Sequence, residues 1–175
     1  MYSYLKEDYR QMKAKDGSFA KLLLQVLFNA GFRAVFLYRI GRSLRLKRVK
    51  IGAVLCEKLM HHTCHCWIST NAEIGPGFVI RHVGTIVIGS NVVAGRNLDI
   101  RQGITIGGNM GKRSSDGRTQ PKLGDNVLIG AGAVVVGPIE IGNNCVIGAN
   151  SVVTQSFNNN SVIAGIPGVI IKRNN

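Results

Sequence analysis

Apolar residues recur at every sixth position through most of residues 68–153, and a small residue usually follows each of them. These anchors are Ile68, Ile74, Ile80, Ile88, Ala94, Ile100, Ile106, Leu123, Ile129, Val135, Ile141, Ile147 and Val153. A period of six matches neither the turn of an α-helix nor a simple hairpin sheet. It matches a short strand followed by a tight turn, with three such units closing one triangular coil. The sequence therefore predicts a prism of stacked coils.

Within each six-residue unit, the first and fifth side chains are predicted to point into the prism, because side chains alternate along a strand. The fifth positions are apolar or small, as this requires: Ala72, Val92, Leu98, Ile104, Val127, Ala133, Ile139, Cys145 and Ser151. Cys145 is accordingly interpreted as a core residue and not as a reactive thiol. The glycines that follow many of the anchors are predicted to allow tight corners.

Two steps in the period differ from six and mark candidate functional segments. The step from Ile80 to Ile88 is eight residues. The step from Ile106 to Leu123 is seventeen, which equals one further unit plus an excursion over residues 112–122. That excursion is polar and rich in turn-forming residues, so we predict a protruding loop there.

Residues 1–66 are predicted to form a helical region ahead of the repeat domain, which spans residues 67–175. Apolar residues near the start have helical spacing: Leu5, Tyr9 and Met12. The sequence Asp16-Gly17-Ser18 predicts a break, after which Ser18 caps the next helix. An apolar stretch from Leu22 to Tyr38 follows, too interrupted by polar residues to supply the roughly twenty apolar residues of a membrane span.

A basic cluster comes directly after this apolar stretch: Arg39, Arg42, Arg45, Lys47, Arg48 and Lys50. The formal net charge of the chain is +13. Most of it lies in residues 1–67, which hold thirteen Lys or Arg residues against four acidic ones. An apolar helix with a basic end is typical of an interfacial membrane anchor, and equally of a helical layer buried against a partner subunit. The four cysteines form no disulfide-dense pattern and no cleavable signal is recognisable, so we expect the cytoplasm, with the inner membrane face as the peripheral alternative.

His82 is the one histidine within the repeat, and it lies at the step of eight. Its position two residues after Ile80 predicts a corner, with the imidazole facing away from the core. A histidine near neutral pKa can take a proton from an alcohol and return it to a leaving group. The alternative on position alone is an ordinary surface histidine.

Several segments around the breaks resemble the serine acetyltransferase branch of the hexapeptide-repeat acyltransferases. They are Arg81 to Gly89, Gln102 to Gly108, Pro121 to Leu123, Ile129 to Ala133 and the closing Ala164 to Gly168. The resemblance covers residues 68–171 and keeps the order and nearly the spacing of the motifs. It implies a mainly β fold, a left-handed parallel β-helix with an N-terminal α-helical region. It also implies a homotrimer or a multiple of it, with acetyl-coenzyme A as co-substrate in the groove between neighbouring prisms.

The resemblance implies roles for individual residues. The general base falls on His82. Coenzyme A contacts fall at Gly108, Ala131 and Ala149, where small residues admit the pantetheine chain. The terminal cations Lys172 and Arg173 are candidates for binding the nucleotide phosphates.

Two departures from the pattern concern the acceptor. Serine acetyltransferases carry an acid before the catalytic histidine, where this chain has Arg81, and a second histidine before Pro-Lys, where it has Gln120. Both side chains help to hold the charged amino acid, and the helical region here is also shorter than in those enzymes. The pattern therefore resembles more closely the acetyltransferases of polysaccharide gene clusters, such as the colanic-acid type. Arg81 and Gln120 become candidate contacts for a sugar or polysaccharide. For Arg81 the alternatives are an acidic sugar or a phosphate on the acceptor and, as is commoner for such a residue, a salt bridge within the protein.

We accordingly predict an O-acetyltransferase that moves acetyl directly from acetyl-coenzyme A to a glycan hydroxyl, with serine as the alternative acceptor. A non-enzymatic scaffold is a further alternative. Nucleic-acid binding is not expected, because the basic segment has no recognised motif for it. Carbonic anhydrases of this fold need three zinc-binding histidines, and the repeat holds His82 alone. The cluster His61-His62-Thr63-Cys64-His65-Cys66 lacks the two separated ligand pairs of structural zinc sites, so we expect packing there and no metal.

Overall fold

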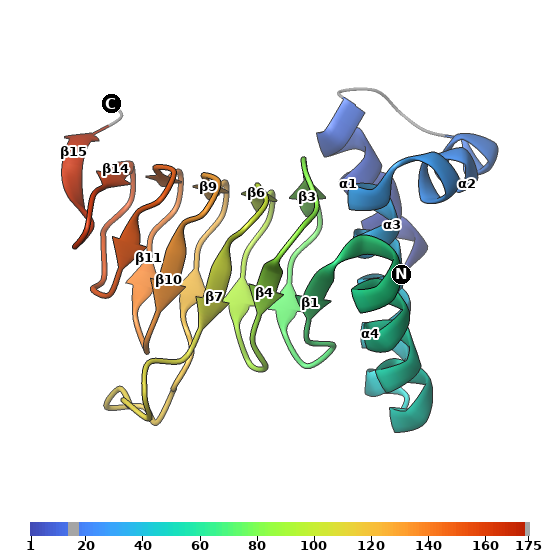
Figure 1. The fold of residues 1–175 in the computed structure, drawn as a ribbon, viewed down its shortest axis with the longest axis horizontal. Coiled ribbons are helices and arrows are strands. Elements are labelled where there is room, and N and C mark those ends of the chain that lie inside the picture. The colour runs from blue at the N-terminus through green and yellow to red at the C-terminus, as the bar shows by residue number, and fades with distance from the viewer. Residues whose placement is uncertain (14–17, 174–175) are drawn as a thin grey trace.

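In the computed structural model, which describes residues 1–13 and 18–173, helices gather at one end and short strands stack beside them as a ladder (Figure 1). The helices are α1 (Tyr2–Lys13), α2 (Phe19–Phe28), α3 (Ala30–Leu46) and α4 (Lys50–Cys64). The strands are β1 (Cys66–Ile68), β2 (Glu73–Ile74), β3 (Val79–Ile80), β4 (Ile86–Ile88), β5 (Val93–Ala94), β6 (Asp99–Ile100), β7 (Thr105–Gly107), β8 (Lys122–Leu123), β9 (Leu128–Ile129), β10 (Val134–Val136), β11 (Glu140–Ile141), β12 (Val146–Ile147), β13 (Val152–Val153), β14 (Ser161–Ala164) and β15 (Val169–Arg173).

Three sheets form the faces of the prism. Sheet A has the order β1-β4-β7-β10-β13, sheet B the order β11-β8-β5-β2, and sheet C the order β15-β14-β12-β9-β6-β3. Strands of successive coils pair in parallel, and β15 closes sheet C by pairing antiparallel with β14. The chain visits the three faces in turn, so the predicted parallel β-helix of triangular coils is confirmed.

The predicted inward positions make up the core of the prism. None of the thirteen anchors is more than 4% exposed, and every fifth-position residue is buried, Cys145 included. Each fully buried Ile, Leu or Val contributes roughly 1.5–3 kcal/mol relative to an exposed one. Because the same two positions are buried in coil after coil, the period alone explains this core.

The glycines after the anchors serve the close stacking of coils. A Cβ at Gly130 would lie 2.5 Å from the backbone nitrogen of Ala149 in the next coil. None of the described glycines in this position has a left-handed φ. One corner instead uses asparagines at φ of 56–62°, which Asn tolerates better than most residues, and their side-chain amides bond to one another in a ladder: Asn97, Asn126, Asn144 and Asn160. The predicted strain of a bulkier residue at these glycine positions therefore comes from contact with the next coil and not from a left-handed φ.

The apolar stretch from Leu22 to Tyr38 is divided between two helices. Helices α2 and α3 meet at Asn29 with a bend of 111°. The Asn29 side chain caps α3 by accepting a hydrogen bond from the Phe32 N–H at 2.9 Å, which favours a new helix over continuation of the old one. Ser18 precedes α2 as predicted, although its side chain makes no capping bond, and Asp16 and Gly17 lie outside the described residues.

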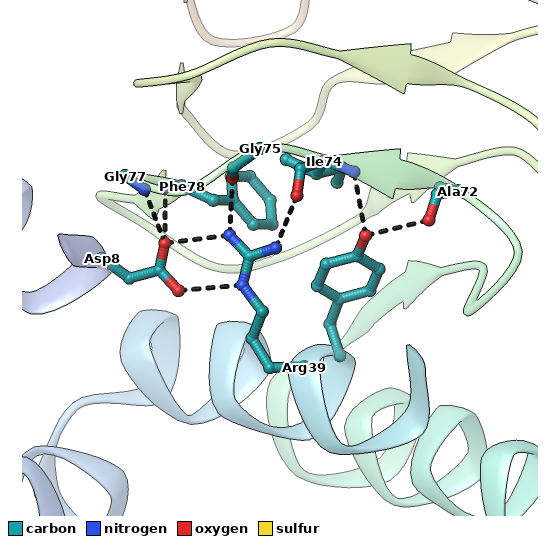
Figure 2. A network of polar contacts seen from close by, with 8 residues as sticks. Asp8, Arg39, Ala72, Ile74, Gly75, Gly77 and Phe78 are labelled. Atoms are coloured by element: carbon teal, nitrogen blue, oxygen red, sulfur yellow. Dashed lines mark hydrogen bonds and ion pairs between the residues drawn. The ribbon is translucent and has the colours of Figure 1, made fainter. Parts of the chain in front are cut away.

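A buried ion pair joins α1 and α3 to the first coil (Figure 2). Asp8 is fully buried, and its carboxylate receives two bonds of 2.9 Å from the Arg39 guanidinium. The same carboxylate accepts 2.8 Å bonds from the backbone N–H groups of Gly77 and Phe78. Burial raises the pKa of Asp8, against the lowering effect of Arg39 and of these N–H donors.

Arg39 and its neighbour Tyr38 complete this connection from α3. Arg39 donates to the carbonyl oxygens of Ile74 at 2.6 Å and Gly75 at 2.7 Å. The Tyr38 hydroxyl donates to the Ala72 carbonyl at 2.9 Å and accepts from the Ile74 N–H at 3.1 Å. These bonds satisfy the backbone at the open end of the prism, where no further coil pairs with it.

Much of the basic cluster is also used to attach α3. Besides the buried Arg39, Arg45 bonds to the Thr70 hydroxyl at 2.8 Å and lies 3.5 Å from a Glu57 carboxylate oxygen. Among the described helices, none has on its own the length and apolar composition of a membrane span; α2 and α3 together do, but only as the bent pair. An interfacial membrane contact does not need such a span, so it stays a prediction.

Candidate active site

His82 lies on the loop between β3 and β4, which turns the chain from sheet C to sheet A. Its side chain is exposed, while the following Val83 is half-buried and packs against the core of the prism. The loop bonds to the next coil through the Gly84 carbonyl, which accepts from the Gly103 N–H at 2.8 Å. The two additional residues of the step of eight therefore form an outward corner that presents the imidazole to solvent.

Ala131 and Ala149 lie at the same corner in later coils. The Gly132 N–H donates to the Gln102 carbonyl at 3.0 Å, and the Asn150 N–H donates to the Ala131 carbonyl at 2.8 Å. Ala131 is half-buried and Ala149 exposed. The structure thus brings these two predicted coenzyme A contacts and His82 to a single edge of the prism, with small side chains along the edge below the imidazole.

Gly108 and Gln120 lie at a different corner, between sheets A and B. The side-chain amide of Gln120 packs against the backbone of two glycines. A Cβ added to Gly89 would lie 2.9 Å from Oε1 of Gln120, and one added to Gly108 would lie 3.0 Å from its Nε2. Its Oε1 is buried and has no hydrogen-bond partner among the described residues. Strand β4 runs from the corner that carries His82 to the corner that carries Gln120, and a strand rises about 3.3 Å per residue. The two side chains therefore lie at opposite ends of this strand and are not brought together within one chain.

The segment between β7 and β8 extends away from the prism (Figure 1). Arg118 attaches this segment to the prism through an ion pair of 2.6 Å with Glu140 of β11. Arg118 also forms an ion pair of 2.6 Å with Asp116 in the same segment. Hydrogen bonds from Ser114 and Arg118 hold the pKa of Asp116 well below its usual range. Lys122, the last residue of the predicted excursion, belongs to β8.

Lys172 and Arg173 end β15, and both are exposed. Strand β15 is the last strand of sheet C, whereas β3, which leads to His82, is the first. With strands spaced at about 4.8 Å, the two cations lie roughly 24 Å along the prism from the histidine loop. They are therefore not part of its immediate surroundings within one chain.

Arg81 pairs with a carboxylate that sequence reasoning did not single out. Its guanidinium donates to Asp99 at 2.8 and 3.0 Å, and Arg101 pairs with the other oxygen of the same carboxylate. The spacing offered a signal, because Arg81 and Arg101 begin the same corner in successive coils. Asp99 lies between Leu98 and Ile100, which occupy the two inward positions, so its outward direction could also have been read from the period, although Asp99 is itself buried.

The predicted packing of the His61–Cys66 segment is seen at the junction of α4 and β1. Cys64 and Cys66 are buried, and burial raises the pKa of Cys66 to about 11. The rings of His61 and Trp67 lie edge to face with centroids 5.9 Å apart. In the described parts of the chain, no three His, Cys, Asp or Glu side chains are grouped so that they could hold a metal ion.

Comparison with known proteins decides the family. Residues 120–155 match the bacterial transferase hexapeptide model (six repeats). A serine acetyltransferase of Staphylococcus aureus strain Mu50 is 35% identical over 173 residues, which are 99% of this chain and 80% of that enzyme. The chain belongs to the serine acetyltransferase family. It is thus an acyltransferase of the hexapeptide-repeat class, as the motifs predicted.

Solved structures of serine acetyltransferases share the whole fold. The enzyme from Brucella abortus in complex with coenzyme A has a TM-score of 0.87 and 32% identity, covering 99% of this chain and 68% of that one. The enzyme from Neisseria gonorrhoeae in complex with serine has a TM-score of 0.84 and 32% identity, covering 96% and 68%. These relatives are serine acetyltransferases, and they give the comparison with colanic-acid enzymes no support.

Proposed function

We propose that the chain is an acetyl-coenzyme A-dependent O-acetyltransferase, with serine as the leading acceptor. The similarity to serine acetyltransferases extends over nearly the full chain, and one of the similar structures holds coenzyme A and another serine. The observation that carries the proposal is the exposed imidazole of His82 on the edge that also holds Ala131 and Ala149. A base and a small-residue edge are what direct transfer from a thioester requires.

In this mechanism, His82 takes the proton of the acceptor hydroxyl as that oxygen attacks the thioester carbonyl. The C–S bond then breaks, and the proton passes from the imidazolium to the leaving thiolate. Backbone N–H groups lining the groove stabilise the oxyanion, each worth about 3–4 kcal/mol when well placed. The transfer needs no acyl-enzyme, and the buried Cys145 is not available to form one.

A neighbouring prism completes the site in this proposal. Gln120 and His82 flank the same sheet but at opposite edges, so a second subunit must bring the one corner near the other. Sheet A presents apolar side chains outward between these edges, with Trp67 43% and Val87 41% exposed. We therefore propose a homotrimer with acetyl-coenzyme A between prisms. Lys172 and Arg173 stay predicted contacts of its phosphates.

A glycan hydroxyl is the second candidate acceptor, and one observation favours it. Arg81 and Gln120 replace the acid and the second histidine that the family resemblance associates with the amino acid. Serine therefore has to be bound here by other side chains than in the enzymes that this chain resembles, or a different alcohol takes its place.

A thiol-release assay with acetyl-coenzyme A distinguishes these acceptors. We expect saturable release with serine, compared against a panel of sugars and polysaccharides. His82→Ala is expected to lower kcat by about 10²–10⁴-fold, while His62→Ala, which removes an exposed histidine outside the repeat, leaves it unchanged. Full activity of His82→Ala would refute the general base. Saturable turnover of a sugar with none of serine would make the glycan the acceptor.

A further inference from the structure

We propose that Arg81 and Arg101 form an anion-binding site beside His82, which selects an acceptor that carries a carboxylate or phosphate close to its reacting hydroxyl. The inference rests on the proposed function and names the chemistry of its acceptor. Neither the sequence motifs nor the similarity to other enzymes assigns Arg101 a role.

The charges of the cluster do not balance. Asp99 is 9% exposed and receives both guanidinium groups, Arg81 on Oδ2 and Arg101 on Oδ1. Among the described side chains, one carboxylate neutralises one of the two cations, so the cluster of Arg81, Asp99 and Arg101 carries a charge of +1. The one further described hydrogen bond to these side chains comes from Arg81 Nη1 to the Met12 carbonyl on α1, at 3.4 Å, which brings no negative charge.

Unused donors of the two arginines reach solvent. Their side chains are 37% and 30% exposed, in contrast to Arg39, whose side chain is 4% exposed and donates four hydrogen bonds to protein. Arg81 bonds to Oδ2 of Asp99 through Nε and Nη2, and Arg101 bonds to Oδ1 through Nη1, so Asp99 takes up only part of the donors of each guanidinium group. Planar guanidinium groups bind carboxylate and phosphate oxygens in pairs, so two that share one acid form a ready anion site.

The cluster is placed for the acceptor and not for the adenine nucleotide. Arg81 directly precedes His82, and its N–H donates to the Ile100 carbonyl, next to Arg101 in the following coil. Both arginines therefore begin the corner that presents the imidazole. An anion held there leaves a neighbouring hydroxyl within reach of His82, as in serine or in a sugar acid. The predicted phosphate contacts Lys172 and Arg173 lie at the far end of sheet C.

Binding of inorganic phosphate tests the site without any turnover. The thermal midpoint is measured with coenzyme A already saturating, so that the nucleotide site is filled, and with chloride matching the ionic strength. Phosphate is expected to raise the thermal midpoint of the wild type. Most of that shift is expected to be lost in the Arg81→Gln variant and in the Arg101→Gln variant. Each single variant keeps Asp99 paired with the other arginine, so the fold is retained. Arg96→Gln removes an exposed arginine at another corner and should keep the full shift. No phosphate shift in the wild type, or an equal shift in all four proteins, would overturn the proposal.

Matched acceptors test the selection and identify the source of the anion. Serine is compared with serinamide, and galacturonate with galactose. For whichever pair is turned over, Arg81→Gln and Arg101→Gln are expected to raise KM for the anionic member about tenfold or more, with little change for the neutral member and for acetyl-coenzyme A. An equal loss for anionic and neutral acceptors indicates a structural role and refutes the site. An enzyme that acetylates none of these acceptors contradicts the proposed function, while the phosphate titration still decides the anion site.

Discussion

The prism and the helical region are stabilised in different ways. In the prism, each coil buries the same two side chains per unit, so stability is spread over many similar contacts. In the helical region, the connection to the prism depends on single residues, above all Asp8, Arg39 and Tyr38. The difference teaches that a repeat tolerates local change and a unique polar contact does not.

The breaks in the repeat combine both kinds of stabilisation. The His82 loop keeps backbone pairing with the next coil, yet it carries a polar cluster that occurs once in the described chain. The proposed chemistry is thus located where a coil departs from its neighbours. The following substitutions test the contrast between the repeated contacts and the unique ones.

Breaking the buried ion pair is expected to have the largest effect on stability. Arg39→Met leaves the Asp8 carboxylate buried without its cation, which costs about 3–5 kcal/mol in the free energy of unfolding. Denaturant unfolding measures it. The double variant Asp8→Leu with Arg39→Met should recover much of the loss, because no charge is then buried.

The Arg39→Met variant should also depend on pH in a defined direction. Without Arg39, the folded-state pKa of Asp8 rises further above its unfolded value, so the native state holds the proton more tightly. Its stability is then greatest at low pH and is lost as pH rises through the folded pKa. A deficit that is the same at pH 5 and pH 8 would contradict this account of the pair.

An added methyl group between coils is expected to have a smaller but distinct effect. Gly130→Ala places a Cβ against the Ala149 backbone and should destabilise by about 1–3 kcal/mol. Gly107→Ala is the matched control, since its Cβ would meet no atom within 4 Å. Equal unfolding midpoints for the two variants would show that coil spacing adapts freely.

The loop attachment is expected to contribute little to global stability. Arg118→Gln and Glu140→Gln should each change the free energy of unfolding by less than about 1 kcal/mol, because this pair is partly exposed. Limited proteolysis within residues 108–121 should nevertheless become faster in both. If the double variant is cleaved no faster than either single one, the two residues act through the same contact.

Thiol accessibility tests the packing of both regions without any mutation. Cys56 on α4 is half-buried, whereas Cys64, Cys66 and Cys145 are buried. With the Cys66 pKa raised to about 11, its thiolate is scarce at pH 8. A disulfide reagent is expected to label one thiol quickly in the native protein and all four after denaturation. Fast labelling of a second thiol would indicate opening at the junction of α4 and β1.

The fold could be predicted from the sequence where its interactions join residues that are close in sequence. The anchors repeat every six residues, so a short window of sequence reveals the strands, the inward positions and the protruding excursion. The corner position of His82 follows from counting the step from Ile80 to Ile88. The reason for the glycines after the anchors depends on the backbone of the next coil, which no local window shows.

Residues that make a contact found only once in the described chain could not be identified by counting positions in the repeat. Asp8 and Arg39 are 31 positions apart and lie outside the repeat, so nothing local indicates that they meet. Arg81 and Asp99 are 18 positions apart, and only the stacking of successive coils brings them together. The bend at Asn29 likewise divided an apolar stretch that looks continuous in sequence. The amino-acid order determined the stacked coils, because strand alternation and burial act between near neighbours. Only the tertiary structure decided which charges pair and how the helices attach to the prism, because those contacts form after distant segments have been brought together.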